Sequence, residues 1–500
     1  MSLPRRSQSA LEYMMTYGWA ILVIVIVAAV LYSLGIFSPS SSLSTTITGF
    51  SNLGTVNAVC LGGTSFTISM GDSTGYPINI TQINLTSSSG KTTYSPNILI
   101  QPNSIQTVTV PSSSLCTSGA RYSVSAVISY LEPGQLLPGP YTSTGTVAGT
   151  AASPPSSATS YEPLNIINTQ NQGTPSPFQQ MINVTSSSLG WADISSSPFG
   201  QNVEFFSATG QILDSWLENY TSTHAIWWVK LTSSIPAGSK QTIYMGFAPT
   251  STNLFNTNNV GEAPQLSSSY GEYDDGANAF NFYDNFAGTT PNTNNWVVLS
   301  GGSNTITVNN GLNIQAAAGT AGYYLIYSKG TFNPGSVLET DFSYGGPFST
   351  NIGSLNPGFS SSQSSSIVPS AQSQNTVAWT INSAAVGDWV AVQGNNNGVN
   401  GAAPTYVDST GNNSDQPLSI WGVTYTGGTN YWTWHNYQQF TSSSSGAQSS
   451  GGMYVGLGYE SYEYPNGVLT TAINFTFQWV RVRAYPPNGV MPSVSFGSVS

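Results

Sequence analysis

The sequence predicts a mainly β protein, in which one long N-terminal α-helix is followed by three antiparallel β-sandwich-like domains. The 500 residues exceed what one core holds, because single cores stop growing near roughly 250–300 residues. Only 6% of the residues are charged while 39% are hydrophobic, so polarity comes mainly from hydroxyls and amides. Beyond about residue 40, short alternating apolar stretches are separated by Gly, Pro, Asn and Ser, which is typical of strands and turns.

The charge balance argues against nucleic acid as a partner. The net charge is −11, and the chain has nine Lys and Arg residues in all. Phosphate binding needs clustered cations, and cations cluster only at Arg5–Arg6 and at Arg481 with Arg483.

The N-terminal segment is long enough to cross a membrane. From Met14 to Phe37 it is almost wholly apolar or aromatic, without charge or proline. A helix that rises 1.5 Å per residue needs about 20 such residues to span a bilayer. Arg5 and Arg6 precede the segment and no positive residue follows until Lys91, so we expect a cytoplasmic N-terminus. The chain is thus expected in the cell membrane or at the cell surface, with its bulk extracellular.

The stretch "RRSQSALEYMMTYGWAIL" resembles the class III signal peptide of archaeal type IV pilin-like proteins. In that family a prepilin peptidase cuts before a glutamine and leaves the apolar helix attached. The resemblance implies cleavage between Ser7 and Gln8, which gives a leader over 1–7 and a hydrophobic helix over 8–39. The family usually has glycine where Ser7 stands, and serine is similarly small.

The carboxylate of Glu12 lies at the start of the apolar run, where it is costly unless paired. The resemblance implies a role in filament register: Glu12 would accept the α-ammonium of Gln8 from a neighbouring pilin subunit. The alternative is an interfacial carboxylate that faces headgroups and water.

The segment 40–152 is expected to be a β domain closed by a disulfide. "INITQINLT" and "RYSVSAVISY" place apolar residues at alternating positions. Cys60 and Cys116 are the only cysteines, and outside the cell an isolated pair is expected to be bonded. Two free buried thiols are the alternative. The domain resembles the β head of a pilin-like subunit, and a Ser/Pro linker follows over 153–160.

The next domain is expected over 161–268. "HAIWWVKLTSSIPAGSKQTIYMGF" predicts a strand, a Pro-Ala-Gly turn and a second strand. With "PFQQMINVT" and "VEFFSATGQILDSWLENY" it resembles DUF2341, an uncharacterised domain of archaeal and bacterial surface proteins. That resemblance implies an architecture and no established activity.

The last domain is expected over 269–500, where strand patterns alternate with Gly/Asn/Ser turns. "YDNFAGT" near its start and "FQWVRVRAY" near its end resemble concanavalin A-like jelly-roll domains. Two stacked antiparallel sheets are the form that this implies.

A dense aromatic run, "YWTWHNY", is the candidate carbohydrate-binding site. Strand alternation places Trp432 and Trp434 on one face and Tyr431 on the other. One aromatic face would stack on a sugar ring while Asn436 bonds its hydroxyls. The alternative is that one face packs in the core and the other carries cross-strand aromatic pairs.

Glycoside hydrolysis needs two carboxylates about 5–10 Å apart across the sugar. Glu339 and Asp341 alternate onto one strand face, and Glu460 lies near Glu463. Hydrolases of the jelly-roll type carry Glu-x-Asp-x-x-Glu, but here the third acid is replaced by Tyr344. No catalytic residue is therefore assigned, and we do not expect an enzyme.

Two kinds of modification or ligand site remain. Asp274 and Asp275 in "EYDDG" are calcium candidates, although an acidic turn also explains them and no EF-hand spacing is present; no other cofactor is expected. Asn-x-Ser/Thr sequons for N-glycosylation occur at Asn79, Asn84, Asn183, Asn219, Asn412 and Asn474.

Together these features indicate an archaeal cell-surface, pilin-like adhesin or minor filament subunit that displays β-sandwich recognition domains. Its expected partners are the membrane, other pilin subunits, a prepilin peptidase and extracellular glycans. The alternatives are a membrane-anchored structural envelope protein that does not polymerise, or a surface glycoside hydrolase.

Overall fold

The computed structural model describes most of the chain beyond residue 44. The described residues are 45–102, 104–345, 352–365, 376–378, 389–391, 395–396, 399–400, 405–406, 416–427, 432–442, 451–461, 468–469 and 471–499. The expected leader and N-terminal helix, with Ser7, Gln8 and Glu12, lie outside these residues. In the part that is described, no helix is long and apolar enough to cross a membrane. The chain divides into two compact units, Met1–Ser153 (unit 1) and Pro154–Ser500 (unit 2).

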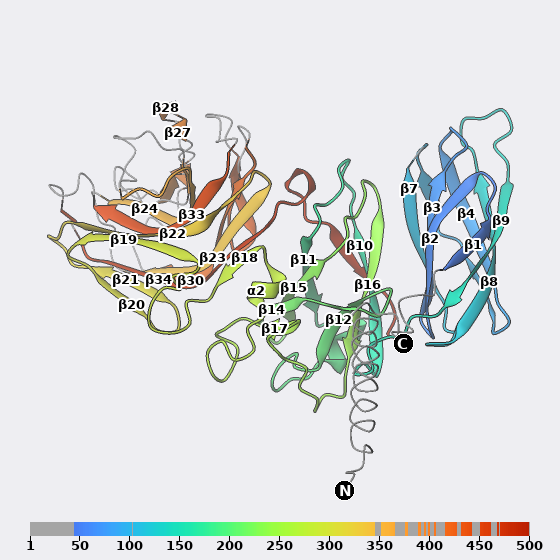
Figure 1. Cartoon of the computed structure of the whole chain (residues 1–500), viewed down its shortest axis with the longest axis horizontal. Helices are drawn as coiled ribbons and strands as arrows, with labels where there is room; N and C mark the ends of the chain where they lie inside the picture. Colours follow the sequence, from blue (N-terminus) through green and yellow to red (C-terminus); the bar gives the residue numbers. More distant parts are fainter. Residues whose placement is uncertain are drawn as a thin grey trace, which may run out of the picture. The chain divides into compact units, whose positions relative to one another are not determined.

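Unit 1 is an antiparallel β-sandwich (Figure 1). One sheet has the order β1-β9-β8-β4-β5, with β6 paired to β4, and the other has the order β2-β3-β7. Its strands are β1 (Thr46–Gly49), β2 (Leu53–Leu61), β3 (Ser65–Asp72), β4 (Ile78–Thr86), β5 (Lys91–Tyr94), β6 (Ile98–Ile100), β7 (Ile105–Pro111), β8 (Arg121–Leu131) and β9 (Tyr141–Thr150).

Strict alternation along the sequence explains this sandwich. In β8 every second residue is buried, including Val124, Ala126 and Ile128, while the residues between them face outward. Cys60 in β2 is bonded to Cys116, with the two Cα atoms 6.5 Å apart, which confirms the expected disulfide. The bond ties a buried strand to the loop that follows β7.

Unit 2 begins with a second antiparallel sandwich, called here the middle sandwich. One sheet has the order β13-β12-β16-β10-β35 and the other has the order β11-β15-β14-β17, in which only β14 and β17 run parallel. Its elements are β10 (Ser160–Ile167), β11 (Phe178–Thr185), the 3₁₀ helix η1 (Leu189–Asp193), β12 (Val203–Ser207), β13 (Ile212–Leu213), β14 (Ser215–Tyr220), β15 (His224–Leu231), β16 (Lys240–Phe247), β17 (Val260–Glu262) and β35 (Ser493–Phe496).

The C-terminal strand does not lie where the expected boundaries put it. We expected 269–500 to form one separate domain, but β35 pairs with β10 from Leu164↔Phe496 to Ile167↔Ser493. Figure 1 shows this dark red strand among the green strands of the middle sandwich. Val494 and Phe496 pack against the core of that sandwich, so apolar burial decides which sheet the strand joins.

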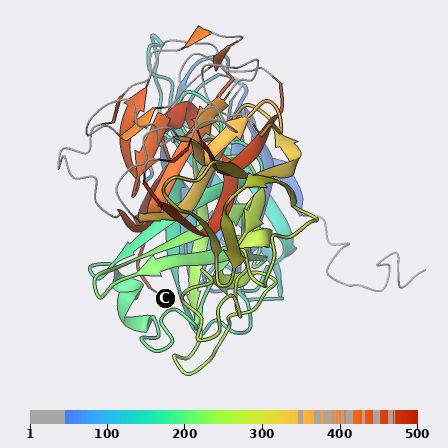
Figure 2. The ribbon, with the colours of Figure 1, turned by 90° about the vertical axis from the view of Figure 1, so that its left-hand side faces the viewer.

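The jelly-roll part of unit 2 consists of two antiparallel sheets, as expected. The larger has the order β20-β21-β34-β23-β30-β31-β32, with β18 paired to β34, and the smaller has the order β19-β22-β33-β24-β25. The pairs β26–β29 and β27–β28 form two further two-stranded sheets. In Figures 1 and 2 the yellow, orange and red strands lie together beside the green middle sandwich.

The elements between the middle sandwich and β35 are bounded as follows. They are α2 (Gly276–Ala279), β18 (Phe282–Asp284), β19 (Trp296–Gly302), β20 (Thr305–Val308), β21 (Leu312–Ala316), β22 (Gly322–Phe332), β23 (Ser336–Gly345), β24 (Ile352–Ser360), β25 (Thr376–Ala378), β26 (Trp389–Ala391), β27 (Asn395–Asn396), β28 (Val399–Asn400), β29 (Thr405–Tyr406), β30 (Gln416–Tyr425), β31 (Trp432–His435), β32 (Gln438–Ser442), β33 (Met453–Ser461), β34 (Ile473–Ala484) and the 3₁₀ helix η3 (Pro487–Gly489).

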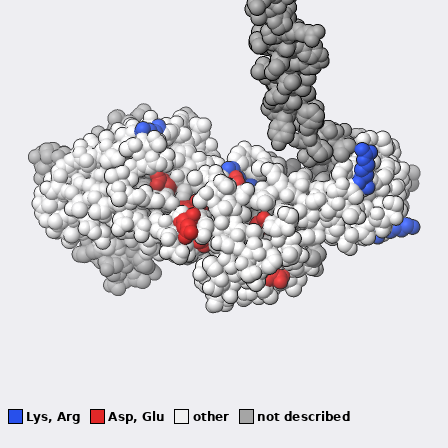
Figure 3. All heavy atoms as spheres, turned by 60° about the horizontal axis from the view of Figure 1, so that its bottom comes forward, with Lys and Arg blue, Asp and Glu red and all other residues white. Residues whose placement is uncertain are grey.

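The middle of β23 and the C-terminal half of β34, from Trp479 onward, are buried on both faces, which positions the candidate site. Their inner residues, such as Leu338 and Phe477, belong to the jelly-roll core. Their outer residues, such as Glu339 and Arg481, face the sheet β11-β15-β14 of the middle sandwich. We call this contact the junction. Charge is otherwise scarce on the surface, and the face in Figure 3 is mostly neither acidic nor basic.

Candidate functional site

A buried ion network occupies the junction. Glu339 on β23 accepts hydrogen bonds from two arginines of β34, at 2.8 Å from Arg481 Nε and at 2.8 and 3.1 Å from Arg483 Nη2 and Nε. Trp434 on β31 donates its indole N–H to the same carboxylate at 3.0 Å. Because Arg481 and Arg483 alternate along β34, both guanidinium groups point to the same face of the sheet.

The middle sandwich supplies the second carboxylate. Glu218 Oε2 lies 2.7 Å from Arg481 Nη1 and accepts a hydrogen bond of 2.8 Å from Trp228 Nε1. Tyr437, in the turn between β31 and β32, also donates its hydroxyl to Glu218 and accepts a hydrogen bond from Arg481 Nη2 at 2.8 Å. The network therefore joins the two parts of unit 2 through charged hydrogen bonds.

Aromatic rings surround the Arg481 guanidinium. Its central carbon lies 4.5 Å from the ring centre of Trp228, 4.7 Å from Trp479, 4.8 Å from Phe280 and 5.5 Å from Trp216. In a site that excludes water, each such cation–π contact contributes as much as about 2 kcal/mol. These rings come from both parts of unit 2, so the junction is apolar around a charged centre.

Two carboxyls on β23 titrate in opposite directions. Burial favours a neutral Glu339, but the Arg483 and Arg481 guanidinium groups outweigh it and lower the pKa of Glu339 to about 2. Burial and the nearby Glu218 raise the pKa of Asp341 to about 7, although Arg481 opposes the rise. The site thus holds one firmly ionised carboxylate and one that keeps its proton near neutral pH.

The free energy of unfolding of unit 2 is expected to fall as the pH rises from 5 to 8, and Asp341→Asn is expected to lessen that fall. The unfolded chain releases the Asp341 proton near pH 3.8, whereas the folded chain keeps it to about pH 7. The stability that Asp341 contributes is therefore fully present below pH 3.8 and is lost as the pH rises through about 7. Each unit between the two pKa values corresponds to about 1.4 kcal/mol. Urea unfolding at both pH values measures the difference.

Burial also raises the pKa of Glu204, Glu262 and Asp275 in unit 2, so these groups add to the pH dependence of wild type and variant alike. The difference between wild type and Asp341→Asn therefore isolates the contribution of Asp341. The pKa of Glu339 is lowered instead of raised, but this carboxyl titrates below the pH range of the experiment. Equal pH dependence in wild type and variant would contradict the assignment.

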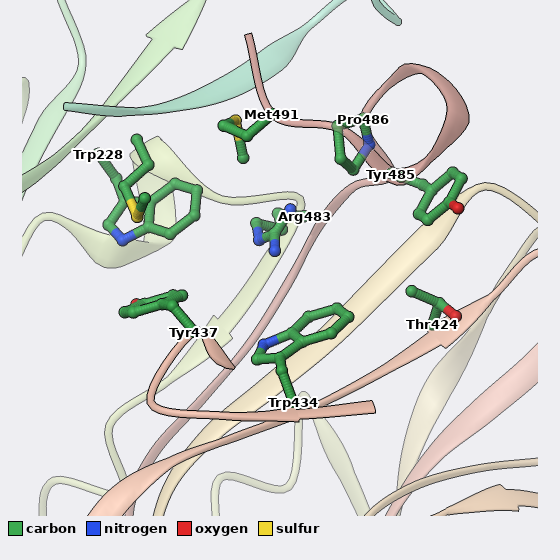
Figure 4. Close-up of a pocket in the computed structure, with 10 residues that line it drawn as sticks. Trp228, Thr424, Trp434, Tyr437, Arg483, Tyr485, Pro486 and Met491 are labelled. Atoms are coloured by element: carbon green, nitrogen blue, oxygen red, sulfur yellow. The ribbon is translucent and has the colours of Figure 1, made fainter. Parts of the chain in front are cut away.

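A cavity of about 150 Å³ adjoins the network at the junction (Figure 4). The middle sandwich contributes Met181 and Trp228, while β31 and the following turn contribute Trp434 and Tyr437. The remaining lining residues are Thr424, Arg483, Tyr485, Pro486, Gly489 and Met491. Figure 4 shows Arg483 in the middle of this group, between Trp434 on one side and Met491 on the other. We call this space the junction cavity.

The structure describes the side chains of two of the four residues expected to bind glycan, Trp434 and Asn436. Trp434 is 8% exposed and lines the junction cavity. Asn436 lies exposed in the turn after β31, with a positive φ of 48°, and its side-chain oxygen accepts a hydrogen bond from the backbone of Ile420 at 3.0 Å. Trp432 is the first residue of β31, and its side chain is not among the parts that the structure describes. Tyr431 lies outside the described residues.

The carboxylates considered for hydrolysis are buried. Glu339 is 0% and Asp341 7% exposed, and both face the junction. Glu460 on β33 is also buried, and Glu463 lies outside the described residues. Tyr344, which stands in place of the third acid, packs in the jelly-roll core.

The two calcium candidates lie in a hydrogen-bonded turn. Asp274 accepts hydrogen bonds of 2.8 Å from each of Trp216, Tyr283 and Asn285, so protein donors already surround its oxygens. Burial raises the pKa of the neighbouring Asp275 to about 7. Among the residues that the structure describes, no group of three or more His, Cys, Asp and Glu is placed to hold a metal ion.

The sequons differ in accessibility. Asn183 and Asn474 are exposed, whereas Asn79, Asn84 and Asn219 are half-buried. Asn412 lies outside the described residues.

Sequence reasoning missed that Glu218, Trp228, Arg481 and Arg483 belong to one site. A usable signal was present, because "WVRVRAY" places two arginines on one face of an otherwise apolar strand. Buried arginines need carboxylate partners, and "ETD" supplies one on another apolar strand. The partner from the middle sandwich, Glu218, had no comparable signal.

Comparison with known proteins finds a family model for part of unit 2. The model described as "Domain of unknown function (DUF2341)" matches residues 199–299. The chain therefore contains a DUF2341 domain, and the match runs past the expected boundary at residue 268.

One curated relative is similar over much of the chain. "Uncharacterized protein 562" of Sulfolobus islandicus rod-shaped virus 1 is 29% identical over 369 residues, which cover 66% of this chain and 58% of the relative. The chain thus spans less than two thirds of the length of that relative.

Solved structures of low sequence identity resemble about two fifths of the chain. A β-1,3-glucanase from Mycobacterium marinum is 14% identical (TM-score 0.29, 41% of this chain, 98% of that chain). The Bacillus licheniformis β-glucanase is 12% identical, with a TM-score of 0.30, and the match covers 40% of this chain and 97% of that chain. A pseudo β-1,3-glucanase and immunostimulatory antigen of Mycobacterium tuberculosis is 14% identical, with a TM-score of 0.30, and the match covers 41% of this chain and 98% of that chain. None of these similarities bears on the activity of this chain.

Proposed function

We propose that this chain is a pilin-like cell-surface adhesin that recognises glycans at the junction cavity of unit 2. The observation that carries the proposal is the cavity itself, where Trp228, Trp434 and Tyr437 meet a hydrogen-bonding guanidinium. Aromatic rings stack on the apolar face of a sugar ring, and polar groups bond its hydroxyls. The cavity is smaller than the roughly 300–1,000 Å³ of drug-sized sites, so it suits a single ring at the end of a glycan.

The full chain in detergent micelles is expected to bind at least one glycan on a glycan array, and Trp434→Ala is expected to weaken that binding roughly 30-fold. The reason is that removing an aromatic anchor from a binding site costs about 2 kcal/mol or more. Trp191→Ala is the matched control, because Trp191 packs against Phe199 in the middle sandwich and does not line the cavity. Thermal unfolding verifies that both variants fold. Equal binding by wild type and Trp434→Ala would contradict glycan recognition at this site.

Three features support display outside the cell. The apolar N-terminal segment would anchor the chain in the membrane, with the leader cleaved between Ser7 and Gln8. The bond between Cys60 and Cys116 suits an oxidising environment. Asn183 and Asn474 are the exposed sequons of the described part, and we propose that they carry glycans.

Sheared surface filaments from the native cells are expected to contain this chain with Gln8 as its first residue. Cleavage there frees the α-ammonium that Glu12 of a neighbouring subunit would accept. Mass spectrometry of the N-terminal peptide makes the measurement, with the membrane fraction as the comparison. An intact leader found only in the membrane fraction would favour the alternative, an envelope protein that does not polymerise.

A further inference from the structure

We propose that the junction cavity takes a sugar ring that carries a carboxylate, such as a uronic acid, and that Arg483 binds this carboxylate. The inference rests on the proposed function and narrows it from glycans in general to acidic ones.

The contacts of Arg483 leave one edge of its guanidinium open. Of its five N–H donors, Nε–H and one Nη2–H form a side-on pair with Glu339, at 3.1 and 2.8 Å. One Nη1–H reaches the backbone oxygen of Ala484 at 3.4 Å, which is a long contact. Among the described residues, the second Nη2–H and one Nη1–H have no hydrogen-bond partner, and these two nitrogens form the end of the group. Two parallel donors of this kind match the two oxygens of a carboxylate.

The rings around Arg483 fix the direction of that edge. The guanidinium carbon lies 4.9 Å from the ring centre of Trp228 and 5.5 Å from that of Trp434. With Glu339 holding one edge as well, the group is nearly fully buried, and it lines the cavity. Figure 4 shows its nitrogen atoms inside the ring of lining side chains. The donors are thus held in place before a ligand arrives, which lowers the entropy cost of binding.

The charge of the lining favours an anion over a neutral sugar. Arg483 is the charged residue among those that line the junction cavity, and the described lining contains no Asp or Glu. Glu339 and Glu218 lie behind it, where Glu339 is paired with both arginines and Glu218 with Arg481. A neutral sugar would meet these donors with hydroxyl oxygens, which accept weaker hydrogen bonds than a carboxylate does.

The test compares two probes that differ only at C6, methyl β-D-glucuronide and methyl β-D-glucoside. Titration of the full chain in detergent micelles, followed by tryptophan fluorescence, gives both dissociation constants. The glucuronide is expected to bind about 10- to 100-fold more tightly, the range for a hydrogen bond to a charged group. The preference is expected to decrease as salt is added.

Met491 provides the matched pair of variants, because it lines the cavity without belonging to the ion network. Met491→Glu is expected to abolish the preference for the glucuronide, since its carboxylate would occupy the open edge of Arg483. Met491→Gln, which is similar in shape and neutral, is expected to keep the preference. Arg483→Lys is expected to reduce the preference about tenfold, because lysine retains the charge and loses the paired donors.

The outcomes separate this inference from the function on which it rests. Equal affinity for the two sugars would overturn the acidic ligand and leave glycan recognition intact. A preference that survives both Met491→Glu and Arg483→Lys would overturn the role of Arg483. Binding of neither sugar would overturn the inference, and the array comparison of wild type with Trp434→Ala would then decide the proposed function by itself.

Discussion

Replacing Glu339 by glutamine is expected to lower the free energy of unfolding of unit 2 by about 3–5 kcal/mol, the usual cost of breaking a buried ion pair. Glutamine has nearly the same shape, so the loss comes from charge. Without the Glu339 carboxylate, Glu218 would be the carboxylate left in contact with Arg481, and both arginines are nearly fully buried. Urea unfolding at pH 7, followed by tryptophan fluorescence, measures the change, because unit 2 holds the tryptophans of the described part.

Asp214→Asn is the matched control. Asp214 forms an ion pair with Lys230 at 3.4 Å in the same unit, but the two side chains are 32% and 25% exposed. Exposed pairs of this kind contribute about 0–1 kcal/mol, so this variant is expected to differ little from wild type. If the two substitutions cost the same, the network at the junction does not have the stabilising role given to it here.

Reducing the disulfide is expected to lower the free energy of unfolding of unit 1 by about 4 kcal/mol. Cys60 and Cys116 are 56 residues apart, and closing a loop of that length restricts the unfolded chain considerably. Unit 1 depends on this restriction because it is a small sandwich with a single core. Urea unfolding with and without dithiothreitol, followed by circular dichroism, measures the effect.

Unit 2 serves as the internal control for this experiment, because it contains no cysteine and its transition should not move with reductant. A double Cys60→Ala/Cys116→Ala variant repeats the measurement without reductant. An unchanged transition for unit 1 in both cases would mean that the bond contributes little to its stability.

The strands could be predicted wherever one face is buried and the other is not. Alternation in "RYSVSAVISY" predicted a strand over 121–130, and β8 runs from Arg121 to Leu131. A period of two residues is a local property, because successive side chains point to opposite faces whatever the strand pairs with. The disulfide could also be predicted from the sequence, since two cysteines allow only one pairing.

Partners distant in the sequence could not be predicted in this way. Nothing in "SVSF" specifies that β35 pairs with β10, because a short strand fits any free sheet edge. Likewise, the alternation of Trp432 and Trp434 predicted one aromatic face, but it did not predict that Trp434 would meet Glu339 and Arg483 beneath the middle sandwich. Such contacts depend on how two sheets face each other, which strand periodicity does not record.

The return of β35 to the sheet that begins at β10 has a mechanical consequence. The chain crosses from the middle sandwich to the jelly-roll before α2 and crosses back after η3, so two covalent connections join the two parts. With the membrane anchor that we propose, tension from the N-terminal side would enter unit 2 at β10, and β10 pairs with β35, the strand that follows the second crossing. A glycan held in the junction cavity would pull on both parts at once, and the load would be shared by both crossings and by the ion network between them.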